Sequence, residues 1–208
     1  MRDPLDDAVD ALSRGDLVIF PTDTVYGLAA RPDDAAAVRK LFLVKRRPDD
    51  LGVPVLVASV VDAHRVALLH GPAERLAAAW PGPITLVLPR TAESADWDLG
   101  GDAATVAVRI PRHPLALALL ARTGPLAVTS ANVSGQPPLE DADSLALAFG
   151  DEVAVYLCEE APLSGPASTV VDLTGEAPRV LRAGAVPEAD IAQLLAGEGP
   201  LLDSRPSP

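Results

Sequence analysis

The stretch that decides the fold is Pro21-Thr22-Asp23-Thr24-Val25-Tyr26-Gly27, which follows the apolar run Leu17-Val18-Ile19-Phe20. The apolar run predicts a short buried strand, and Pro21 is expected to end it because proline has no N–H for a sheet ladder. Thr22, Asp23 and Thr24 then place two hydroxyls and a carboxylate at the carboxyl end of a strand, where open α/β sheets bind ligands. Gly27 permits a tight turn or a close approach to a ligand. Taken alone, the stretch is equally well interpreted as a polar turn that caps the next helix.

Outward from this stretch, apolar periodicity and Pro/Gly punctuation predict irregularly alternating helices and strands. Helices are expected at residues 4–14, from Asp33 or Asp34 to Lys45, and at 62–69, 74–80, 114–122, 141–149 and 187–195. Strands are expected at residues 17–20, 53–58, 84–88, 105–110, 126–129, 153–157, 168–173 and 179–181. Residues 91–102 are expected to form a polar, mobile loop. We therefore predict one α+β domain over residues 1–196, with helices packed on a mixed sheet, and a loose tail over 197–208.

The composition limits the possible function classes. Hydrophobic residues make up 49% of the 208, so the chain can bury a sizeable core, while a net charge of −12 argues against binding nucleic acid or anionic membranes through bulk charge. Cys158 is the only cysteine, which excludes a disulfide framework and a cysteine-based zinc site. The three histidines show no metal-ligand spacing. With no signal-like N-terminus and no apolar run long enough for a bilayer, a cytoplasmic protein without a membrane partner is expected.

A second informative stretch is the basic segment Lys45-Arg46-Arg47-Pro48. Five of the 17 basic residues lie between Arg39 and Arg47 of this acidic chain. Lys45 and Arg47 are expected on one side of an extended segment that leaves the helix, where an ammonium and a guanidinium suit a polyphosphate or a carboxylate. The alternative is that these cations only complement the dipole at a helix C-terminus.

Further polar residues follow other predicted strands. The stretch Thr129-Ser130-Ala131-Asn132-Val133-Ser134-Gly135 follows a short apolar run, and its hydroxyls, amide and backbone N–H groups suit phosphate oxygens or, alternatively, form only an Asn-centred turn. Arg109 and Arg182 each end an apolar run, which indicates either an anionic ligand or a structural ion pair. Ser168 opens a strand and is a candidate ligand hydroxyl. The sequence has no Walker loop, dinucleotide fingerprint or Ser-His-Asp order, so no covalent nucleophile is indicated.

Together these stretches resemble the YrdC family of threonylcarbamoyl-adenylate synthases, which supply a tRNA modification. The matching pieces occur in the family's order over roughly residues 8–186; they are Pro21–Leu28, Lys45–Pro48, Trp80–Thr85, Val106–Arg109, Ser130–Gly135 and Ser168–Asp172. The resemblance implies a YrdC/RibB-like α+β fold, a twisted mixed sheet flanked by helices with a deep concave cleft. It also implies an enzyme, a nucleotidyltransferase that forms threonylcarbamoyl-AMP and pyrophosphate from L-threonine, bicarbonate and ATP.

The resemblance also implies roles for individual residues. Catalysis and triphosphate contacts would fall to Lys45 and Arg47. The threonine and carbamate pocket would be formed by Thr22, Thr24, Tyr26, Arg109, Thr129 and Ser168. The nucleotide would be held by Ser130, Asn132, Ser134 and Arg182. Mg²⁺ would enter with ATP, no protein metal site or organic cofactor is implied, and the product would pass to a tRNA-modifying transferase complex, with tRNA contacts weak or indirect.

Two positions depart from the family's pattern. Leu51 stands where members often have Lys or Asn, and Leu56 stands where some have His. These departures leave open a paralogue that acts on another carbamoyl substrate. A second alternative is a non-catalytic RNA-binding or translation-associated module, against which the net charge and the 3% of aromatic residues count.

Overall fold

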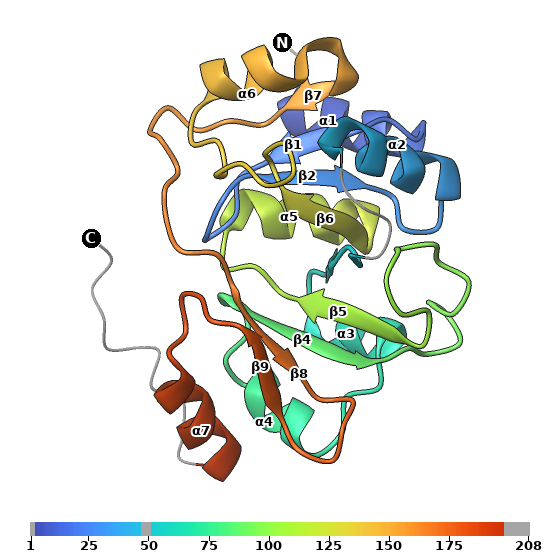
Figure 1. Ribbon diagram of the computed structural model, residues 1–208. Coiled ribbons are helices and arrows are strands. Elements are labelled where there is room, and N and C mark those ends of the chain that lie inside the picture. The colour runs from blue at the N-terminus through green and yellow to red at the C-terminus, as the bar shows by residue number, and fades with distance from the viewer. Residues whose placement is uncertain (1–2, 47–50, 198–208) are drawn as a thin grey trace.

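A computed structural model of the chain describes residues 3–46 and 51–197 (Figure 1). The helices are α1 (Pro4–Ser13), α2 (Ala35–Lys45), α3 (Val60–Val66), α4 (Pro72–Ala77), α5 (Pro114–Thr123), α6 (Ala142–Phe149), the short 3-10 turn η1 (Gly150–Glu152) and α7 (Glu188–Ala196). The strands are β1 (Val18–Phe20), β2 (Gly27–Ala30), β3 (Val55–Leu56), β4 (Ile84–Pro89), β5 (Thr105–Arg109), β6 (Leu126–Ser130), β7 (Val155–Tyr156), β8 (Thr169–Asp172) and β9 (Arg179–Arg182).

Within the described residues the strands form one mixed sheet in the order β7-β1-β2-β6-β3-β5-β4-β8-β9. One half contains the antiparallel strands β1, β2 and β6, with β7 added parallel to β1. The other half contains the antiparallel pairs β4–β5 and β8–β9, with β8 parallel to β4. The two-residue strand β3 joins the halves, because it pairs with both β6 and β5. The predicted mixed sheet flanked by helices is confirmed.

The sheet buries apolar side chains on both faces. Along β1, Ile19 packs into one hydrophobic cluster while Val18 and Phe20 pack into the other, as the two-residue side-chain period of a strand requires. The smaller cluster lies under α1 and α5, and the larger one under α2 and the remaining helices. Burial on both faces explains why these strands are near-continuous apolar runs in the sequence.

The helix starts follow capping rules. The Asp34 carboxylate accepts hydrogen bonds from the N–H groups of Ala36 and Ala37 at 3.0 and 3.1 Å, so Asp34 rather than Asp33 is the N-cap of α2. Asp3, Ser59 and Asp141 cap α1, α3 and α6 in the same way. These caps fix where each helix begins relative to the strand before it.

The structure corrects three sequence expectations. Residues 27–30 form β2, a strand that the sequence did not predict, so the Thr-Asp-Thr stretch is the connection of a β-hairpin rather than a strand-to-helix loop. The strand expected at 53–58 has only two paired residues, Val55 and Leu56. Lys45 is the last residue of α2 and not part of an extended segment, since the chain turns at Arg46, which has a left-handed φ of 51°.

The loop between β4 and β5, residues 90–104, is tied to the body of the protein. Arg90 donates to the carbonyls of Ser94 and Trp97 at 3.0 and 2.6 Å, and the Val53 N–H donates to the Leu99 carbonyl at 2.9 Å. The Leu99 side chain is buried. The loop expected to be mobile is therefore anchored at several points along its length.

Candidate functional site

A pocket of about 610 Å³ opens between the two halves of the sheet. The β1–β2 connection, β3 and the end of β6 contribute residues from one side, and β4, β5, the start of β8 and β9 contribute from the other. Nine of the expected site residues line this pocket; they are Thr22, Thr24, Tyr26, Arg109, Thr129, Ser130, Asn132, Ser168 and Arg182. Segments up to 160 residues apart in the sequence are thus brought to one concave surface.

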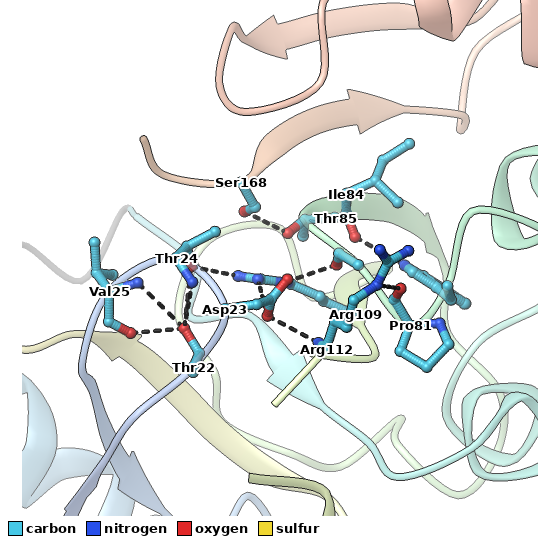
Figure 2. A network of polar contacts seen from close by, with 12 residues as sticks. Thr22, Asp23, Thr24, Val25, Pro81, Ile84, Thr85, Arg109, Arg112 and Ser168 are labelled. Atoms are coloured by element: carbon cyan, nitrogen blue, oxygen red, sulfur yellow. Dashed lines mark hydrogen bonds and ion pairs between the residues drawn. The ribbon is translucent and has the colours of Figure 1, made fainter. Parts of the chain in front are cut away.

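The hydroxyls of the β1–β2 connection are fixed by local hydrogen bonds. Thr22 Oγ1 donates to the Val25 carbonyl at 2.6 Å and accepts from the N–H groups of Thr24 and Val25 at 3.2 and 3.3 Å. It also lies 3.0 Å from Thr24 Oγ1. Because Thr22 closes the turn on itself, Thr24 is the hydroxyl that the turn presents to its neighbours across the pocket (Figure 2).

Tyr26 is fully buried, and its hydroxyl accepts a hydrogen bond from the Glu159 N–H at 3.1 Å. Burial raises the pKa of the Tyr26 phenol, so the phenol stays protonated near neutral pH. The contact joins the β1–β2 hairpin to the long connection between β7 and β8.

Gly27, the next residue, lies in β2 with its Cα against Val128, where an added Cβ would approach Cγ1 of that valine to 2.6 Å. Close packing, and not a tight turn, explains this glycine.

Arg109 ends β5 and lies 6% exposed at the base of the pocket. Its Nε donates to the Gly82 carbonyl at 3.1 Å, and its two terminal nitrogens donate to Thr24 Oγ1 at 3.0 Å and to Asp23 Oδ1 at 2.6 Å (Figure 2). Burial lowers the pKa of Arg109 and the Asp23 charge opposes this shift. An arginine remains protonated in either case. Arg109 forms the structural ion pair that was one of the two alternatives, and it also lines the pocket.

Arg182 ends β9 and reaches the same region from the opposite side. Its Nε and one terminal nitrogen donate to the Ser168 carbonyl at 3.2 and 2.8 Å, and the terminal nitrogen also lies 3.1 Å from Ser168 Oγ. Ser168 Oγ in turn lies 2.8 Å from Thr85 Oγ1. Burial lowers the pKa of Arg182, and among the residues that the structure describes no carboxylate pairs with it.

Lys45 lies beside the pocket rather than on its lining. Its Nζ donates to the Ser130 carbonyl at 2.5 Å, to Asn132 Oδ1 at 2.8 Å and to the Asn132 carbonyl at 3.1 Å, and the side chain is 2% exposed. Asn132 is fixed from its other side, since its Nδ2 donates to the carbonyls of Val133 and Gln136. Lys45, Ser130 and Asn132 therefore form one polar cluster at the edge of the pocket.

The remaining residues that the sequence analysis singled out lie partly in the pocket and partly outside it. Thr129 is a buried residue of β6. Ser134 does not line the pocket, and its N–H donates to the Lys45 carbonyl at 2.9 Å. Arg47 lies outside the described residues. Leu51 and Leu56, the two departures from the family's pattern, both line the pocket.

The sequence analysis missed several residues and contacts in and around this pocket. Asp23 lay in the quoted stretch, but its partner Arg109 is 86 residues away and no local pattern shows that contact. Thr85 contacts Ser168 across the paired strands β4 and β8. Arg90, Gly100, Gly101 and Asp102 also line the pocket. Arg90 follows a strand just as Arg109 ends one, so the same signal could have identified it.

Within residues 3–46 and 51–197, no helix is long and apolar enough to cross a membrane. In the same part of the chain, no group of three or more His, Cys, Asp or Glu residues is placed to hold a metal ion.

Residues 10–184 match the model of the Sua5/YciO/YrdC family, which is described as "Telomere recombination". The chain belongs to this family. A Mycobacterium tuberculosis family member, provisionally named threonylcarbamoyl-AMP synthase, is 45% identical over 190 residues, which are 90% of this chain and 87% of that protein. The threonylcarbamoyl-AMP synthase of Pyrococcus abyssi is 38% identical over 191 residues, 90% of this chain but 56% of its own length.

Solved structures of the family agree with the fold. The crystal structure of P. abyssi Sua5 complexed with L-threonine matches with a TM-score of 0.82 and 34% identity, over 93% of this chain and 58% of that one. Escherichia coli YciO matches with a TM-score of 0.80 at 24% identity, over 88% of this chain and 90% of its own, and supports the fold alone. The chain thus spans little more than half of the Sua5 protein and almost all of YciO.

Proposed function

We propose that the protein is a threonylcarbamoyl-AMP synthase. It joins L-threonine, bicarbonate and ATP into threonylcarbamoyl-AMP and pyrophosphate, for the N6-threonylcarbamoyl modification of adenosine 37 in tRNA. The names of the Mycobacterium and Pyrococcus relatives and the L-threonine bound to P. abyssi Sua5 support this function. The observation that carries it is the pocket itself, which is lined by the buried Arg109, by Arg182 from the opposite side and by several hydroxyls.

The reaction has two bond-forming steps. The neutral amine of threonine adds to CO₂ derived from bicarbonate, which forms the N–C bond of a carbamate and releases a proton. A carbamate oxygen then attacks the α-phosphorus of ATP, and pyrophosphate leaves. Apart from CO₂, every species in this sequence is anionic, so the site contributes positioning and positive charge more than a nucleophile. It also has to limit water, because the carbamate and the mixed anhydride both hydrolyse.

The threonine end of the pocket is assigned to the arginine side. Arg109 would take the threonine carboxylate, with the Ser168 hydroxyl beside it, because Arg109 is fixed from three directions and still lines the pocket. Thr22, Thr24, Tyr26 and Thr129 would form the walls around the side chain and the carbamate. The threonine carboxylate would then lie near Thr24 Oγ1, to which Arg109 also donates a hydrogen bond.

The nucleotide is assigned to the cluster at the end of β6. Ser130 and Asn132 would hold it together with Ser134, and Arg182 would close on it from β9. Lys45 would contact the phosphates by exchanging one of its loop acceptors for a phosphate oxygen, with Arg47 as its partner in neutralising charge. Mg²⁺ would enter with ATP, where it neutralises phosphate charge, and no organic cofactor is needed. The product would pass to a tRNA-modifying transferase complex.

Pyrophosphate release tests the proposal. Purified protein is incubated with ATP, Mg²⁺ and bicarbonate, with L-threonine, with L-serine, or without an amino acid. We expect release that depends on both threonine and bicarbonate and is weaker with serine. Folded protein that releases no pyrophosphate with threonine would contradict the proposal and would favour a paralogue whose substrate is set by Leu51 and Leu56, which both line the pocket.

A further inference from the structure

Asp23 holds a position in the site that its place in the sequence does not reveal. It lies in the β1–β2 connection, and one carboxylate oxygen, Oδ1, accepts from a terminal nitrogen of Arg109 at 2.6 Å and from the Arg112 N–H at 2.9 Å (Figure 2). The second oxygen, Oδ2, is buried and has no hydrogen-bond partner among the described residues. The carboxylate therefore acts through Oδ1 alone.

Asp23 differs in kind from the other two partners of Arg109. The Gly82 carbonyl and Thr24 Oγ1 are neutral acceptors, whereas Asp23 brings the only carboxylate that contacts this guanidinium in the described part of the chain. A guanidinium has five N–H donors. Three of those of Arg109 are used by these partners, which leaves one on each terminal nitrogen of a residue that lines the pocket.

Charge explains why a neutral partner would not serve equally well. Arg109 is almost fully buried, and the nearby Arg182 lowers its pKa further. A buried arginine without a counter-charge is costly and would turn toward solvent or other acceptors. Asp23 removes this cost and at the same time fixes the plane of the guanidinium, since a charge-assisted bond is short and directional.

We propose that Asp23 is the positioning residue for Arg109. It holds the guanidinium so that its remaining donors meet the carboxylate of the amino-acid substrate, and it does so without touching that substrate, because Asp23 itself does not line the pocket. The inference rests on the proposed function, in which Arg109 binds the threonine carboxylate. The competing possibility is a purely structural tie, in which Asp23 only joins the hairpin to the chain at Arg112.

Two substitutions separate these roles. Asp23→Asn can keep an oxygen at the position of Oδ1, with its amide nitrogen at the position of Oδ2, so the bonds to Arg109 and Arg112 survive while the negative charge is lost. Asp23→Ala removes both bonds. The matched control is Asp172→Asn, which neutralises an Asp–Arg pair with the exposed Arg179 outside the pocket.

Steady-state kinetics give the first readout. For Asp23→Ala we expect the KM for threonine to rise at least about tenfold and the KM for ATP to stay within about twofold; for Asp23→Asn we expect a threonine KM raised about threefold. Asp172→Asn should match the unsubstituted protein in both. A threonine KM for Asp23→Ala within about twofold of the unsubstituted protein, or an equal rise in both KM values, would overturn the proposal.

The second readout does not depend on catalytic activity. The Arg109 Nε–H resonance is assigned by its loss in Arg109→Lys, and its exchange with solvent is followed by NMR. We expect slow exchange in the unsubstituted protein, faster exchange in Asp23→Asn and no protected signal in Asp23→Ala. If Asp23→Ala does not fold, Asp23→Asn decides by the same measures. If the unsubstituted protein fails to turn over threonine, the proposed function fails, while an Arg109 signal that stays fully protected in folded Asp23→Ala separately overturns the positioning role.

Discussion

Lys45 shows how one residue can belong to both the core and the site. Its ammonium lies 2% exposed and donates to Ser130 and Asn132, the residues assigned to the nucleotide. A buried ammonium is tolerated only with several acceptors, so the cluster keeps a positive charge at the edge of the pocket without exposing it.

Lys45→Ala should therefore reduce both catalysis and stability. We expect pyrophosphate release to fall at least about hundredfold, as when a fixed donor to transition-state charge is removed, and the free energy of unfolding to fall by about 1–3 kcal/mol because buried carbonyls lose their donor. Pyrophosphate assays and chemical denaturation measure the two effects.

The matched control is Lys40→Ala, on the same helix. Lys40 pairs with Asp16 at 3.1 Å and is 41% exposed, so its removal should change stability by less than about 1 kcal/mol and leave activity intact. Near-normal pyrophosphate release by folded Lys45→Ala would exclude a catalytic role for Lys45.

At the scale of elements, the position of β9 depends on close backbone approach. Gly184 follows Arg182, and a Cβ added to it would lie 2.3 Å from the Ala167 carbonyl oxygen and 2.5 Å from the Ser168 carbonyl carbon. Only a glycine lets the chain after β9 lie against the chain before β8. This approach is what allows Arg182 to reach the Ser168 carbonyl.

Gly184→Ala should push these two segments apart. We expect the free energy of unfolding to fall by about 1–3 kcal/mol, as for overpacking in general, and pyrophosphate release to fall with it because Arg182 leaves Ser168. Gly175→Ala, in the turn between β8 and β9, is the control, since its nearest contact would be 4.0 Å away. Unchanged stability and activity in Gly184→Ala would contradict this prediction and would show that the backbone shifts without a loss of folding free energy.

The elements also show what the sequence can predict. Strands rich in β-branched residues, such as Val106 and Val108 in β5, and helices with clear caps were predicted to within a few residues. The strand β2 was missed because Gly27-Leu28-Ala29-Ala30 has no β-branched residue and its strand character comes from pairing with β1 and β6. Lys45 was misplaced because the chain turns only at Arg46, a left-handed position that its side chain does not signal.

For the whole molecule, the pocket lies across the seam between the two halves of the sheet. Thr24 and Ser130 come from one half, and Arg109 and Arg182 from the other, while the strand that joins the halves, β3, has two residues. The residue types on this surface were predictable from the sequence. Their partners were not, because contacts such as Asp23–Arg109 and Lys45–Asn132 join residues 86 and 87 positions apart.

A ligand in this position should stabilise both halves together. At about one hundred times its Kd, MgATP adds about 2.7 kcal/mol to the free energy of unfolding, which corresponds to a rise in Tm of about 5–10 °C for a chain of this size. Differential scanning calorimetry with and without MgATP measures it, with adenosine as the control that lacks phosphates. Two separate transitions, of which only one moves, would contradict a shared site.

The connection from β7 to β8 has a consequence for the timing of synthesis. β7 lies at one edge of the sheet beside β1, and β8 lies near the other edge beside β4, so the chain crosses the whole sheet before it delivers Ser168 to the pocket (Figure 1). Arg182 follows only at the end of the last strand. A nascent chain, or a fragment cut before residue 168, can therefore form the β1–β2–β6 half of the site but lacks both the hydroxyl and the second cation. Under the proposed function, such a fragment should release no pyrophosphate from ATP, because it lacks the groups that β8 and β9 bring to the pocket.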